Sequence, residues 1–207
     1  YAEPRRAQVD ISPKYDCISV GNPEQFCSPT LDRSWRHQLG RCSMKTAAQI
    51  TFPTWKTVTV GNLGSAQETH KRLKEREIKI SRHWAGDMLE RATFEGAEVT
   101  LHLVQVSLKE LDLKDGATTT EIYAAAQRYG LALCPHETAA QLWLQYPDLL
   151  SRGERTLTAM EAIRDSVGYH CVFCLEHQGD GRWLDVSLGY PDSRWDDNDH
   201  WVFVRKD

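Results

Sequence analysis

The chain has 207 residues, of which 41% are hydrophobic and 26% charged, a mixture typical of a folded globular protein. Its formal net charge of −4 is unlike the basic surface of nucleic-acid-binding domains, so we expect no nucleic-acid partner. Charged residues and histidines interrupt every apolar run well before the roughly 20 residues that a membrane-spanning helix needs. We therefore expect a soluble protein that has no membrane partner and resides in the cytoplasm.

Residues 1–43 differ from the rest of the chain. They show neither the helical nor the strand period, and prolines from Pro4 to Pro29 punctuate them. We predict an irregular or disordered extension over 1–43 and a single domain over 44–207. Met44 lies at the boundary, where it is either a natural start or an ordinary internal methionine, and the sequence favours neither interpretation.

The first predicted elements of the domain are a strand and a helix. Residues 55–60 alternate and are rich in β-branched side chains, which indicates a strand. Ser65, followed three residues later by Glu68, matches the capping box that begins a helix. We expect this helix to carry a sparse apolar stripe that extends to Ile80, beside a strongly charged outer face over 71–79.

A short helix and a long strand come next. Trp84 and Met88 have the i, i+4 spacing of one helical face, which predicts one or two further helical turns. Residues 99–106 are apolar in enough positions on both faces to predict a central strand of a sheet.

Two helices are predicted in the middle of the chain. Thr118 and Glu121 form a second capping box, and Gly130 lies where a helix commonly ends. Pro135 then favours a new helix start, and Pro147 ends that helix.

The last quarter of the chain alternates in the manner of strands. We predict strands over 156–163, 170–176, 182–187 and 201–205, with a tight turn at 179–181. The order of elements predicts an α+β fold, in which helices from the N-terminal and middle parts pack on a largely antiparallel sheet that ends in a C-terminal β-meander.

Cys171 and Cys174 are the first candidates for chemistry, because Cys-x-x-Cys pairs occur in zinc sites. A zinc knuckle needs a turn between its cysteines, whereas these two lie within a predicted strand, where residues three apart point to opposite faces. We therefore expect no metal site here and interpret both as small buried side chains.

Cys134 is the second candidate, with His136 close by. A thiol at a helix start can have a lowered pKa, and a nearby histidine can act as its base, so the pair could serve a thiol-dependent or hydrolytic enzyme. The alternative is that Cys134 is buried, while His136 and Glu137 are solvated residues of the first helical turn. No phosphate-binding loop or other local catalytic motif supports an enzyme or predicts a cofactor.

Aromatic and acidic residues gather before the last strand and form a candidate binding surface. Aromatic rings beside carboxylates suit recognition of a protein or a small ligand, and we expect Trp195 to be exposed. A loop cation site is an alternative, but the spacing of a calcium-binding EF-hand is missing. The candidate binding residues are Tyr190, Trp195, Asp196, Asp197 and Asp199.

Two stretches are distinctive: Leu-Cys-Pro at 133–135 and a closing Trp-Val-Phe-Val at 201–204. With them, the chain over 55–206 resembles a family of short proteins from bacteria and environmental samples that keeps this turn and this strand and has no assigned activity. Cys171, Cys174 and His136 depart from the family pattern. The other matching stretches are 55–57, 114–118, 129–132, 142–146, 159–161 and 181–184.

Together these features favour a small binding or interaction module without catalytic activity, whose partner is a protein or a small ligand. The alternative is an enzyme that uses Cys134. A pocket that brings this thiol together with a histidine and a carboxylate would favour the enzyme, whereas a buried thiol without such partners would favour the module.

Overall fold

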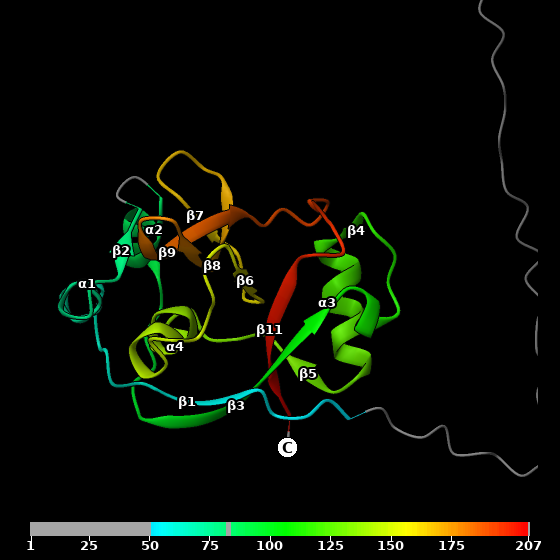
Figure 1. The fold of residues 1–207 in the computed structure, drawn as a ribbon, viewed down its shortest axis with the longest axis horizontal. Helices are drawn as coiled ribbons and strands as arrows, with labels where there is room; N and C mark the ends of the chain where they lie inside the picture. Colours follow the sequence, from blue (N-terminus) through cyan, green and yellow to red (C-terminus); the bar gives the residue numbers. More distant parts are fainter. Residues whose placement is uncertain (1–50, 82–83, 207) are drawn as a thin grey trace, which may run out of the picture. The chain divides into compact units, whose positions relative to one another are not determined.

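The computed structural model describes residues 51–81 and 84–206, which form 11 strands and four α-helices around one core (Figure 1). The predictions for residues 1–43 and for Met44 lie outside the described residues. The strands are β1 (Lys56–Val60), β2 (Lys79–Ile80), β3 (Val99–Ser107), β4 (Ala117–Thr118), β5 (Leu131–Ala132), β6 (Arg155–Thr158), β7 (Ile163–Arg164), β8 (His170–Gln178), β9 (Gly181–Leu188), β10 (Arg194–Trp195) and β11 (His200–Arg205). The helices are α1 (Ala66–Glu75), α2 (Ala85–Arg91), α3 (Thr119–Arg128) and α4 (Thr138–Gln145), with a 3-10 turn at Lys109–Leu111.

The main sheet is mixed. Its strands follow the order β1-β3-β11-β6-β8-β9-β2, with β5 beside β11 and β7 beside β8. The pairs β11–β6 and β2–β9 are parallel, whereas the other pairs of this sheet are antiparallel. The α+β class agrees with the sequence prediction, but the expected largely antiparallel sheet has to be corrected to a mixed one.

The expected C-terminal meander is also corrected. Strands β8 and β9 do form the predicted hairpin, but the chain then leaves the sheet to pair β10 with β4 and returns with β11 between β3 and β6. Trp201, Val202 and Phe203 of β11 are all buried. A strand that is apolar on both faces gains most from a central position, which explains why β11 does not continue the hairpin at the edge.

Helices cover the sheet on two sides, and Figure 1 shows α3 and α4 on opposite sides of β11. On the α3 side, the Tyr123 ring makes edge contacts with Trp201 and Phe203. On the α4 side, Trp143 is buried and its indole Nε1 donates to the Trp183 carbonyl of β9 at 2.9 Å. The central sheet is therefore enclosed by apolar side chains from two separate helices.

The predicted helix starts are confirmed in part. The Ser65 hydroxyl accepts from the Glu68 amide, and the complete reciprocal capping box forms between Thr118 and Glu121. Gly130 has φ +74°, the left-handed conformation that suits a glycine after a helix.

Two local predictions are wrong, and a third is confirmed. The first helix ends at Glu75, so Ile80 lies in β2 rather than on a helical stripe. The helical turns predicted around Trp84 and Met88 are confirmed as α2, which begins one residue after Trp84, and the Trp84 side chain is 57% exposed. The helix expected to open at Pro135 begins at Thr138.

The later start of α4 coincides with the burial of Glu137, which was expected to be solvated. Glu137 has 0% exposure. Its Oε1 accepts from the Gly61 amide at 2.9 Å and from the Glu95 amide at 3.0 Å. Because these two amides follow β1 and α2, one carboxylate joins α4 to two segments that are distant in sequence.

Gln145, at the end of α4, and Tyr146, which caps the helix, bind the free edge of β1, the strand that ends the sheet. Gln145 Oε1 accepts from the Thr59 amide at 3.1 Å, and Gln145 Nε2 donates to the Thr59 carbonyl at 2.8 Å. The Tyr146 hydroxyl donates to the Thr57 carbonyl at 2.6 Å. These side chains give the edge strand the partners that a neighbouring strand would otherwise supply.

None of the described helices is long and apolar enough to cross a membrane.

Glu137→Ala is expected to lower the free energy of unfolding by about 3 kcal/mol, because two backbone amides lose their side-chain acceptor. Urea unfolding followed by circular dichroism measures this change. Glu161 provides the control, since its side chain is exposed and Glu161→Ala should change stability by less than about 0.5 kcal/mol. Equal losses in the two variants would contradict a structural role for the buried carboxylate.

Candidate functional site

The segment between β9 and β11 brings two of the predicted binding residues into a cleft of about 640 Å³, which we call the acidic cleft. Asp199 is only 3% exposed, and its Oδ1 forms an ion pair with Arg155 of β6. Its Oδ2 accepts from the Asp196 amide at 3.0 Å, which shapes the loop. The acidic cleft is lined in part by Trp55, Glu154, Arg155, Asp196, Asp199 and His200.

The charges of the acidic cleft do not cancel. Burial lowers the pKa of the Arg155 guanidinium, but the hydrogen bond to Asp199 outweighs this and raises the pKa, so Arg155 stays charged in its ion pair with Asp199. Glu154 Oε2 accepts from the Ser151 amide at 2.7 Å, and Asp196 Oδ1 accepts from the Asn198 amide at 2.9 Å. The second oxygen of each carboxylate has no hydrogen-bond partner within 51–81 and 84–206.

The other predicted binding residues lie outside the acidic cleft. Trp195 is 7% exposed, so its expected exposure is wrong. Its indole donates to Thr119 Oγ1 at 2.9 Å, and its ring packs edge-on against Trp201 at 4.7 Å. The Tyr190 ring stacks on His170 at 5.2 Å, and Asp197 is exposed without lining the cleft.

Cys134 lies in the core rather than in a pocket. The thiol donates to the Val202 carbonyl at 3.4 Å, and burial raises the pKa of the thiol far above its ordinary value. A protonated, buried thiol is a poor nucleophile.

His136 is half-buried and does not pair with Cys134. Its Nδ1 accepts from the Thr93 amide at 3.1 Å, and its Nε2 lies 3.1 Å from the Glu161 carbonyl, to which it donates. His136 therefore ties two loops together, where the sequence suggested either a catalytic base or a solvated residue.

Cys171 and Cys174 both lie in β8 and are buried. Burial raises the pKa of Cys171 to about 11, and it raises that of Cys174 well above its ordinary value. Within the described part of the chain, no group of three or more His, Cys, Asp or Glu side chains is placed to hold a metal ion.

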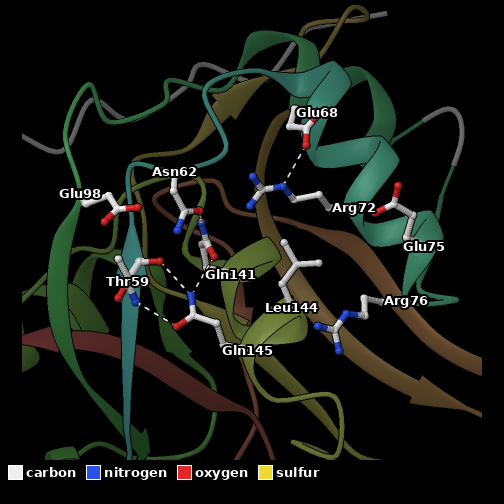
Figure 2. A pocket seen from close by; sticks show the side chains of 10 residues that line it. All are labelled: Thr59, Asn62, Glu68, Arg72, Glu75, Arg76, Glu98, Gln141, Leu144 and Gln145. Carbon is white, nitrogen blue, oxygen red and sulfur yellow. Dashed lines mark hydrogen bonds and ion pairs between the residues drawn. The ribbon is translucent and has the colours of Figure 1, made fainter.

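A second cleft, of about 520 Å³, lies between α1, α4 and the edge of β1 (Figure 2). We call it the polar cleft. Arg72 of α1 and Arg76, the residue that caps this helix, are four residues apart, as are Gln141 and Gln145 of α4, so two pairs of side chains line the cleft. The site was not predicted from the sequence, because the charged face of α1 was expected to face solvent. The polar cleft is lined by Thr59, Asn62, Glu68, Arg72, Glu75, Arg76, Glu98, Gln141, Leu144 and Gln145.

The amide wall of the polar cleft is a connected network. Gln141 Nε2 donates to Asn62 Oδ1 at 2.8 Å and to Glu137 Oε2 at 3.4 Å. Gln145 Nε2 donates to Gln141 Oε1 at 2.8 Å. The network leaves Asn62 Nδ2 without a partner among the described residues.

The comparisons with known proteins assign no family: no protein-family model, no curated protein and no solved structure matches the chain.

Native Cys134 is expected to react with iodoacetamide at least about 100-fold more slowly than Cys134 in urea, because the thiol is buried and protonated. Mass spectrometry of the peptide that contains Cys134 separates it from the other cysteines.

Substitutions at the same position test how Cys134 packs. Cys134→Ala should cost about 1 kcal/mol of stability through lost packing. Cys134→Ser should cost a similar amount, since its hydroxyl retains the Val202 carbonyl as an acceptor. Rapid alkylation of Cys134 in the native protein would contradict a buried, protonated thiol and would support a thiol-dependent enzyme.

Proposed function

We propose that the domain is a non-catalytic binding module whose acidic cleft receives a positively charged side chain of a partner protein. The proposal is supported by the lining of the acidic cleft, which includes the exposed acids Glu154 and Asp196 and the half-buried Trp55. Each carboxylate is oriented by a backbone amide and keeps one oxygen available. A lysine or arginine side chain matches the charge of the cleft, and the Trp55 ring already has one ammonium group over it, that of Lys56, 5.9 Å from the ring centroid.

Charge favours a basic partner over an acidic one. The Arg155–Asp199 ion pair is internally neutral, which leaves Glu154 and Asp196 as the uncompensated charges of the acidic cleft. The formal net charge of the whole chain, −4, acts in the same direction by attracting basic groups. The volume of about 640 Å³ is within the range of ordinary ligand pockets.

A thiol-dependent or hydrolytic enzyme that uses Cys134 is the alternative function. It requires a reactive thiol with a base in hydrogen-bond reach. The Val202 carbonyl is the partner of this thiol, and His136 is bound to Thr93 and Glu161. These contacts favour the binding module.

We place this module in the cytoplasm as part of the same proposal. Cys134, Cys171 and Cys174, the cysteines within the described residues, are all free. Free cysteines accord with a reducing compartment.

Asp196→Asn is expected to weaken binding of tetralysine by about fivefold or more, because it removes one of two uncompensated charges while keeping the acceptor for the Asn198 amide. Isothermal titration calorimetry at low salt measures the dissociation constant. The matched control is Asp197→Asn, which makes the same change one residue away and outside the acidic cleft.

A loss confined to Asp196→Asn supports the proposed site. Equal losses in the two variants, or an undetectable interaction with tetralysine in the unmodified protein, would contradict it. Tetraglutamate should not bind under the same conditions.

A further inference from the structure

The polar cleft carries a second inference, independent of the acidic cleft. Arg72 and Arg76 extend from α1 toward α4, and Leu144 lies between them on the opposite wall (Figure 2). Two guanidinium groups therefore approach one space from the same helix. Guanidinium groups bind carboxylates through paired N–H donors, which makes this arrangement suited to an oxyanion.

Arg72 is held in place by its neighbour on the helix. Its Nε donates to Glu68 Oε1 at 3.0 Å, an i, i+4 ion pair. This bond uses the Nε donor and leaves the terminal Nη donors without a partner among the described residues. Glu68 thus orients Arg72 without using the donors that face the cleft.

Arg76 is anchored through its backbone. Its carbonyl accepts from Arg182 Nη2 at 2.9 Å, so the base of the side chain is fixed at the end of α1. Its guanidinium has no hydrogen-bond partner within the described ranges. Arg76 therefore supplies a further set of free donors beside those of Arg72.

The facing wall is ordered before any ligand arrives. Gln141 and Gln145 use both hydrogens of their side-chain amides within the network, so they are fixed. Asn62 receives one of these bonds at Oδ1, which directs its free Nδ2 donor. Because these side chains are already ordered, little conformational entropy is lost when a ligand binds.

Acidic residues restrict which anion fits. Glu75 and Glu98 both line the same cleft, and neither has an ion-pair partner among the described residues; Figure 2 shows the Glu98 carboxylate turned toward Asn62. A ligand with several negative charges is repelled by this carboxylate. A ligand that carries a carboxylate at one end and an ammonium group beside it satisfies both the arginines and Glu98.

We propose that the polar cleft binds a free α-amino acid. Its carboxylate is held by Arg72, Arg76 and Asn62, its ammonium group faces Glu98, and its side chain contacts Leu144.

L-Alanine is the probe that tests the proposal, with propionate and ethylamine as analogues that lack the ammonium and the carboxylate group respectively. Chemical-shift changes in 1H–15N correlation spectra give the dissociation constants. L-Alanine should saturate the amide shifts of Asn62 and Gln145 with a dissociation constant of about 1 mM or below. Propionate should bind at least about tenfold more weakly, and ethylamine should cause no saturable shift.

Substitutions test which side chains bind L-alanine. Arg72→Gln and Arg76→Gln should each weaken L-alanine binding by about tenfold or more. Arg91→Gln is the matched control, because Arg91 Nε pairs with Asp87 at 3.1 Å on its own helix but lies outside the cleft. Asp196→Asn, which changes the acidic cleft, should leave L-alanine binding unchanged. A negative result for the acidic cleft therefore does not contradict the proposal for the polar cleft.

Three results would overturn the proposal. The first is an absence of saturable shifts with L-alanine up to about 50 mM, far above the expected dissociation constant. The second is an equal dissociation constant in Arg72→Gln, Arg91→Gln and the unmodified protein. The third is tighter binding of inorganic phosphate than of L-alanine, which would assign the arginines to a phosphate instead.

Discussion

The free edge of β1 sets the constraint on which the structure depends. An edge strand exposes backbone amides and carbonyls that need partners. Here α4 provides them, through Gln145 at Thr59, Tyr146 at Thr57 and Glu137 at Gly61. The helix is thereby fixed in position along the edge, and its apolar side, with Trp143 at the centre, is held against the sheet.

The same constraint accounts for the polar cleft. Because α4 turns polar side chains toward β1, its next row of side chains faces α1 across an open space (Figure 2). Gln141 takes part in both arrangements, since it binds Glu137 on one side and Asn62 on the other. The same hydrogen-bond network therefore closes the edge of the sheet and forms one wall of the proposed ligand site. The acidic cleft arises separately, where β11 enters the sheet beside β6.

Structural features that depend on residues close in sequence were predicted, whereas those that depend on distant residues were not. The Thr118–Glu121 capping box, the glycine after α3 and the hairpin at 179–181 depend on residues close in sequence, and the structure confirms them. The place of β11 depends on partners about 50 to 100 residues away, which alternation in one strand cannot specify. The burial of Glu137 depends on Gly61 and Glu95 in the same way. For this reason an acid in a first helical turn was wrongly assigned to solvent.

Amide hydrogen exchange at the edge of β1 tests whether α4 closes this edge of the sheet. The amides of Thr59 and Gly61 point away from β3, so in a free edge strand they exchange at nearly unstructured rates. If α4 closes the edge, the Gly61 amide should exchange at least about 100-fold more slowly than in an unstructured peptide, with Thr59 also protected. Rapid exchange of both amides in the intact protein would contradict the account.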